Sequence, residues 1–76
     1  MPHIIVKMLP GRSEAQKQAL TDAITKSVME IAVCSESAVS VAIEDVEDAK
    51  WTEQVYKPDI AAHWDRLYRK PGYSPD

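Results

Sequence analysis

The sequence has a single cysteine, Cys34, and only two histidines, His3 and His63, among its 76 residues. One cysteine excludes a disulfide within the chain, and two separated histidines do not have the spacing of metal ligands. Basic residues are few: nine lysines and arginines against twelve acidic residues give a net charge of −3. Nucleic-acid binding requires a basic patch. We therefore expect no metal, no cofactor and no nucleic-acid partner.

Long apolar runs are also missing. No stretch reaches the roughly 18 apolar residues of a membrane span, and the N-terminus lacks the charged segment and apolar core of a signal peptide. With a lone cysteine, these features predict a cytoplasmic protein without a membrane partner. We expect one domain, residues 1–76, which buries only about 60% of its unfolded surface. Self-association is the remaining way to complete a core.

The first two thirds of the chain have the pattern of strand, helix and strand. Apolar residues on both faces predict a strand over residues 3–9. Ser13 is suited to cap a following helix over residues 14–33, and Gln16 completes a capping box. Alternating apolar residues predict a second strand over residues 38–46.

The helix is expected to be amphipathic. Its apolar stripe is predicted to hold Leu20, Ile24, Val28 and Ile31, flanked by Ala19, Ala23 and Ala32. The opposite, polar side is predicted to hold Lys17, Gln18, Thr21, Asp22, Thr25 and Lys26.

The predicted fold class is α/β (α+β), built on a βαβ unit. The two strands of such a unit are parallel, with a right-handed crossover in about 98% of cases. Two strands and one helix cannot cover themselves. We therefore expect a homodimer that forms a four-stranded sheet under two helices.

The last third has a different pattern. Trp51, Val55 and Tyr56 indicate a turn or two of helix, which Pro58 is expected to interrupt. A C-terminal helix is predicted to begin at Pro58 and to stop at Pro71, and residues 73–76 form a tail. One face of this helix is predicted to hold Ile60, Trp64, Leu67 and Tyr68, and its last turns Arg66, Arg69 and Lys70.

Pro2 is the first candidate for chemistry. If Met1 is removed, Pro2 carries a free secondary amine at the head of a strand. An α-amino group has an ordinary pKa of about 7.7–8.0, and burial or a nearby cation lowers it toward the pH at which a general base is most effective. The alternative is that Pro2 is an accident of the translation start.

Three further residues are weaker candidates for substrate binding. Arg12 could lower the pKa of Pro2 and bind a carboxylate with paired hydrogen bonds, or it could be a solvated turn residue. Trp51 could form an apolar wall of the pocket, or serve a core or interface. Ser40 could contact substrate, although a strand hydroxyl is usually bonded locally. His3 is expected to be structural, because adjacent strand residues point to opposite faces.

Together, Met1-Pro2 before a strand, Gly11-Arg12-Ser13, the capped helix and the second strand resemble the 4-oxalocrotonate tautomerase family over roughly residues 1–51. The tryptophan and the ending Lys70-Pro71-Gly72-Tyr73-Ser74 resemble its PptA subgroup. The resemblance implies a dimeric tautomerase, an isomerase that interconverts keto and enol forms.

The resemblance also implies roles for the candidate residues. Pro2 would be the general base, Arg12 would bind a carboxylate, and Trp51 would line the pocket. Better-known members have a second arginine where this chain has Ser40, so a dicarboxylate substrate is less expected than a monocarboxylate or an aryl enol such as phenylenolpyruvate.

Two alternatives remain open. One is a hydratase or dehalogenase in which protonated Pro2 acts as an acid while a carboxylate, with Glu44 or Asp45 as candidates, activates water. The other is a non-catalytic dimeric interaction domain.

Overall fold

The computed structural model describes residues 1–75 of the chain. Backbone contacts divide it into two compact units, Met1–Asp45 and a second that begins at Val46. Each unit is described by itself below. The expectation of a single domain over residues 1–76 stays a prediction, and Asp76 of the predicted tail lies outside the described residues.

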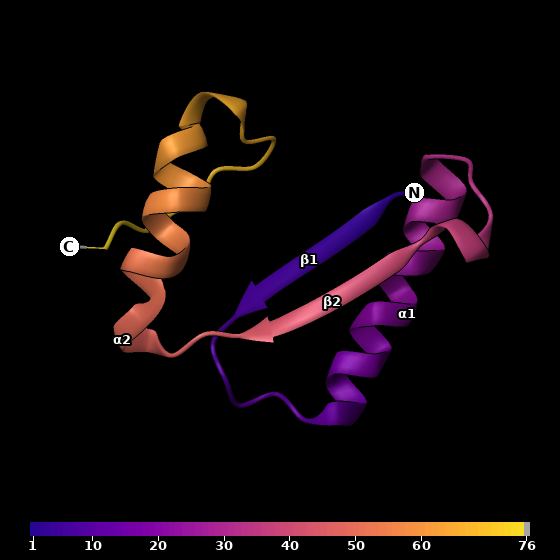
Figure 1. The fold of residues 1–76 in the computed structure, drawn as a ribbon, viewed down its shortest axis with the longest axis horizontal. Coiled ribbons are helices and arrows are strands. Elements are labelled where there is room, and N and C mark those ends of the chain that lie inside the picture. The colour runs from indigo at the N-terminus through magenta and orange to yellow at the C-terminus, as the bar shows by residue number, and fades with distance from the viewer. Residues whose placement is uncertain (76) are drawn as a thin grey trace. The chain divides into compact units, whose positions relative to one another are not determined.

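The first unit is a βαβ motif, as predicted (Figure 1). Strand β1 (His3–Met8) and strand β2 (Ser40–Asp45) lie side by side and are parallel, with His3 opposite Ser40 and Met8 opposite Asp45. A short 3-10 turn, Glu36–Ala38, leads into the second strand, which is therefore shorter than the predicted range of 38–46. The elements are β1 (His3–Met8), α1 (Glu14–Ile31) and β2 (Ser40–Asp45).

Helix α1 begins at the predicted cap. The Ser13 hydroxyl accepts from the Gln16 backbone N–H at 3.1 Å, and the Gln16 side chain accepts from the Ser13 backbone N–H at 2.8 Å. Both bonds satisfy backbone donors that the first helical turn leaves free. The capping-box prediction is confirmed.

The C-terminal end of α1 differs from the prediction by two residues. The helix ends at Ile31, and Val33 adopts a left-handed backbone with φ 55°. The Cys34 N–H then donates to the Met29 carbonyl at 3.3 Å, the long bond of a Schellman motif. Glycine usually occupies this left-handed position, so the sequence had no local signal for the stop.

The face of α1 that packs on the sheet matches the predicted stripe only in part: Ile24 and Val28 are half-buried as predicted, whereas Leu20 and Ile31 are exposed. Lys17 and Thr21, which were predicted on the polar side, are half-buried, whereas Ile31 is 82% exposed. The Thr21 and Thr25 hydroxyls donate to carbonyls one turn earlier, so their polar atoms are satisfied beside the sheet. The half-buried residues of the helix are Lys17, Thr21, Ile24, Thr25, Val28 and Met29.

The sheet has one covered and one open face within this unit. Asp45 is the register partner of Met8, so the two side chains share a face of the sheet. Asp45 is bonded to Lys17 of α1, so this face is the one toward the helix. On the other face, Ile5 is 53% exposed. The covered positions are Ile4, Val6, Met8, Val41 and Ile43, and the open ones are His3, Ile5, Lys7, Ser40, Ala42 and Glu44.

The second unit corrects the prediction for the last third. A helical run passes through Pro58, is kinked at His63 and ends at Arg66, so neither Arg69 nor Lys70 lies in a helix. The segment around the proline is a π-helix, whose wider turn shifts the carbonyl that a proline ring would otherwise meet in an α-helix. The run comprises α2 (Asp48–Trp51), the π-helix η2 (Thr52–Ile60) and the 3-10 helix η3 (Ala61–Arg66).

Little of the single chain is shielded from water. Among the described residues, only Val46 and Val55 are buried apolar side chains. None of the described helices is long and apolar enough to cross a membrane.

Candidate functional site

Pro2 is half-buried at the N-terminal end of β1 and is tied to the segment that enters β2. Its carbonyl accepts from the Ser40 backbone N–H at 3.1 Å, and the amino group of Met1 donates to the Ala38 carbonyl at 2.6 Å. The bond from Ser40 is made by Pro2 itself and does not depend on Met1, whereas the bond from the Met1 amino group exists only while Met1 is present.

The Ser40 side chain is bonded to His3. The two residues are register partners on the open face of the sheet, and the His3 Nδ1 and Ser40 Oγ atoms are 2.6 Å apart. The hydroxyl thus has a local partner, as is common for serine in a strand. A role for Ser40 in substrate binding stays a prediction.

Arg12 lies beyond the opposite end of β1 from Pro2. Its guanidinium donates to the Leu9 carbonyl at 3.4 Å and is exposed. The strand between them rises about 3.3 Å per residue, so the two ends are separated by roughly 20 Å, more than an arginine side chain spans. One chain does not bring Pro2 and Arg12 together.

Trp51 ends α2 in the second unit and is half-buried. Its indole Nε1 donates to the hydroxyl of Tyr73 at 2.8 Å. The Tyr73 ring also lies against that of Tyr56, with ring centroids 5.6 Å apart and planes inclined by 56°. Sequence reasoning missed Tyr73, because the only signal was an aromatic residue just after the Pro71-Gly72 turn.

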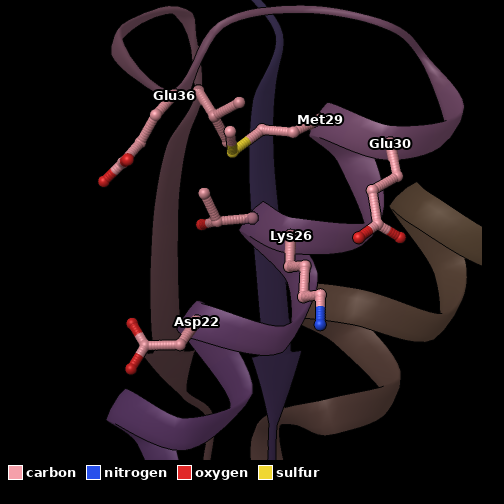
Figure 2. Close-up of a pocket in the computed structure, with 7 residues that line it drawn as sticks. Asp22, Lys26, Met29, Glu30 and Glu36 are labelled. Atoms are coloured by element: carbon pink, nitrogen blue, oxygen red, sulfur yellow. The ribbon is translucent and has the colours of Figure 1, made fainter.

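A hollow in the first unit lies between α1 and the segment entering β2 (Figure 2). It has a volume of about 510 Å³ and is lined by Asp22, Thr25, Lys26, Met29, Glu30, Glu36 and Val39. None of the predicted site residues is among them. Three carboxylates and one ammonium lie around the Met29 and Val39 side chains there. In the part of the chain that the structure describes, no group of histidine, cysteine and acidic residues could hold a metal.

Lys17 of the first unit has a shifted pKa. The hydrogen bond with Asp45 raises the pKa of Lys17 above its ordinary value, and the charges of Asp45 and Glu14 add to this effect. The pair joins α1 to β2 at the end of the sheet away from Pro2. The role of this ion pair is structural, because Asp45 is bonded to Lys17.

Comparison with known proteins identifies the family. The family model described as "Tautomerase enzyme" matches residues 2–55. A probable tautomerase from Xylella fastidiosa is 49% identical over 73 residues, which cover 96% of this chain and 89% of the relative. Tautomerase PptA from Cronobacter sakazakii is 45% identical over 74 residues, which cover 96% and 97% of the two chains.

Solved structures support the same assignment. TomN, a 4-oxalocrotonate tautomerase homologue of the tomaymycin biosynthetic pathway, aligns with a TM-score of 0.64 and 30% identity over 84% of this chain and 95% of that one. YwhB, another homologue of 4-oxalocrotonate tautomerase, aligns with a TM-score of 0.59 and 39% identity over 60% and 75% of the two chains. With its βαβ unit and its matched residues 2–55, the chain belongs to the tautomerase enzyme family and is an isomerase.

Proposed function

We propose that this tautomerase interconverts keto and enol forms of small 2-oxo acids or aryl enols, with Pro2 as the general base after Met1 is removed. The observation that carries the proposal is the position of Pro2, which begins the family match and is fixed by the bond from the Ser40 N–H to its carbonyl. A rigid ring gives the nitrogen lone pair a defined direction. An α-amino group titrates close enough to neutral pH to accept and return a proton.

The reaction needs only a proton shuttle and charge stabilisation. Pro2 would remove a proton next to a carbonyl or from an enol hydroxyl and return it elsewhere on the conjugated system. Negative charge develops on the substrate oxygen during this transfer and must be stabilised by fixed donors. Arg12 and backbone N–H groups would supply these donors, so the proposed mechanism requires neither metal nor cofactor.

The Arg12 that serves Pro2 would come from a second copy. Both strands of the sheet have a free edge in the single chain. A two-fold axis pairs a strand with its own copy in the antiparallel direction. Pairing β1 in this way would bring Pro2 of one chain to the end of the partner strand from which Arg12 follows. Each pocket would then combine both subunits.

A homodimer would also cover apolar surface that the single chain exposes. On α1, Leu20 is 37% and Ile31 is 82% exposed, and on the open sheet face Ile5 is 53% exposed. Burying such side chains stabilises a fold by about 25 cal/mol per Å² of apolar surface. We propose that the protein works as a homodimer in the cytoplasm.

The substrate would carry at most one carboxylate near the reacting carbon. Arg12 is the single cation among the candidate residues, and the Ser40 hydroxyl is bonded to His3 and carries no charge. A guanidinium binds one carboxylate with paired hydrogen bonds. With Trp51 as an apolar wall, an aryl enol such as phenylenolpyruvate is the substrate we favour.

The test begins with the mature N-terminus. Intact mass and N-terminal sequencing should show that Met1 is absent, and the ketonisation rate of phenylenolpyruvate should fall at least roughly 10²-fold in Pro2→Ala, the lower range for general acid–base catalysis. The control is Tyr68→Phe, a change at a fully exposed side chain, which should keep most of the activity. A rate in Pro2→Ala equal to that of the wild type would overturn the proposal.

A further inference from the structure

The C-terminal tail closes back on α2 and η2 through Tyr73. The Tyr73 side chain makes two contacts there: its hydroxyl accepts from Trp51 Nε1 at 2.8 Å, and its ring packs against Tyr56. Trp51 and Tyr56 belong to one continuous helical run, and Tyr73 belongs to the tail. Tyr73 lies outside residues 2–55, the part of the chain that the family model matches.

The hydrogen bond to Tyr73 determines which groups of the Trp51 indole are available to a ligand. An indole has one donor, Nε1–H, and no acceptor. Because Tyr73 takes that donor, the polar edge of the indole is satisfied and its two faces remain as apolar, aromatic surface. A hydroxyl that accepts one bond keeps its own O–H to donate. The pair therefore presents a half-buried indole whose donor is satisfied, with a single hydroxyl at its edge.

The ring contact restricts movement of this pair. Tyr73 is 48% exposed and sits after the Pro71-Gly72 bend, so it could otherwise rotate with the tail. Its inclined packing on Tyr56 is the tilted geometry that aromatic pairs favour. Tyr56 belongs to η2, the helix that continues directly from Trp51. Tyr73 thus links Trp51 to the next turns of its own helical run.

We propose that Tyr73 is a positioning residue that holds the Trp51 indole in the orientation in which its face receives an aryl substituent of the substrate. This inference rests on the function proposed above, in which Trp51 lines the pocket. It adds that selectivity for aryl enols over smaller enols depends on the C-terminal tail. Planar rings stack on an indole face with offset or edge-to-face geometry, which requires that the indole be held still.

The hydrogen bond between Trp51 and Tyr73 can be tested without an activity assay. The sequence has two tryptophans, so a Trp64→Phe background leaves Trp51 as the single fluorescent indole. In this background Tyr73→Phe removes the acceptor and keeps the ring. Tyr68→Phe is the matched control, because Tyr68 is fully exposed. Trp51 emission should change in Tyr73→Phe and stay unchanged in Tyr68→Phe.

Kinetics test the role in specificity. We expect Tyr73→Phe to raise the KM for phenylenolpyruvate by about 2- to 10-fold, the ratio that corresponds to one net hydrogen bond. The kcat should stay within about twofold, since Pro2 and Arg12 are untouched. The KM for enolpyruvate, which has the carboxylate without the ring, should not change. Tyr73→Ala, checked for folding by circular dichroism, should enlarge the same selective effect because it also removes the ring contact.

The outcomes separate this proposal from the one on which it rests. If Pro2→Ala is inactive but Tyr73→Phe matches Tyr68→Phe on both substrates, the positioning role of Tyr73 is overturned and the catalytic proposal stands. Unchanged Trp51 emission in Tyr73→Phe also overturns it, whatever the kinetics. If Pro2→Ala keeps the wild-type rate, the proposed function is overturned, and the specificity role of Tyr73 with it.

Discussion

Lys17 and Asp45 join the first turns of α1 to the last residue of β2 through an ion pair of 2.9 Å. The Lys17 side chain is 18% exposed and that of Asp45 is 39% exposed. The pair is therefore partly shielded from solvent, and it bridges residues 28 positions apart in the sequence.

This pair predicts a loss of stability at alkaline pH. The pKa of Lys17 is raised in the folded chain, so its contribution is fully present below the unfolded pKa and is lost as pH rises through the folded pKa. Wild-type protein should lose stability above about pH 10.4, the ordinary pKa of lysine. Lys17→Met, which keeps the aliphatic stem, should be less stable than the wild type at neutral pH. Its free energy of unfolding should fall less than that of the wild type as the pH rises above this value.

Urea unfolding at several pH values, at one protein concentration, measures this effect. Lys57→Met is the matched control, because Lys57 pairs with Glu53 at 2.7 Å but both side chains are more than half exposed. Exposed pairs contribute little to stability. Equal pH profiles for Lys17→Met and wild type would contradict the assignment.

Val33 offers a stabilising substitution. Its φ of 55° is strained for a β-branched residue, and its side chain is 83% exposed, so little packing depends on it. Val33→Gly should raise the free energy of unfolding by about 0.5–1 kcal/mol, which is the relief of left-handed strain less the greater entropy of glycine in the unfolded chain.

Ala32→Gly is the control for this substitution. Ala32 has an ordinary right-handed backbone, with φ −83° and ψ −7°, so glycine there brings flexibility without relieving strain. Urea midpoints should rise for Val33→Gly and fall for Ala32→Gly. A decrease for both would show that Val33 is not under strain.

A pocket shared between subunits predicts complementation. The variants Pro2→Ala and Arg12→Ala should each have reduced activity when they are assayed at a low concentration of a carboxylated substrate. If the two are denatured and refolded together in equal amounts, half of the dimers are mixed, and each mixed dimer has one pocket with both residues intact. The mixture should then regain about a quarter of the wild-type activity, as expected for random two-fold assembly.

The unmixed variants, refolded separately and combined only in the assay, are the control for subunit exchange. If Arg12 acts on Pro2 of its own chain, a mixed dimer contains no intact pocket. No gain on refolding together would therefore reject the shared arrangement.

The sequence was sufficient for the βαβ unit because its signals are local. Ser13 and Gln16 are three residues apart, and the alternation in the strands is read within a few positions. The face of α1 was predicted only in part, for a related reason. Thr21 was assigned to the polar side by its chemistry, but its hydroxyl is satisfied by the Lys17 carbonyl and can lie beside the sheet.

The second unit was predicted less well, because its determinants are not local. Pro58 is a helix breaker by propensity, yet the run continues through it as a π-helix, a form with no reliable sequence signal. The bond between Trp51 and Tyr73 joins residues 22 positions apart. Trp51 could be proposed as a pocket residue from the family resemblance, whereas the partner that fixes its indole required the structure.

Because few side chains are buried in the single chain, the stability of the folded protein is expected to depend on its concentration. With Val46 and Val55 as the only buried apolar residues among those described, a lone subunit has little to hold it folded. We expect folding and pairing to be a single equilibrium, so that the melting temperature rises with protein concentration. Simple dilution would then act on this enzyme as a denaturant does.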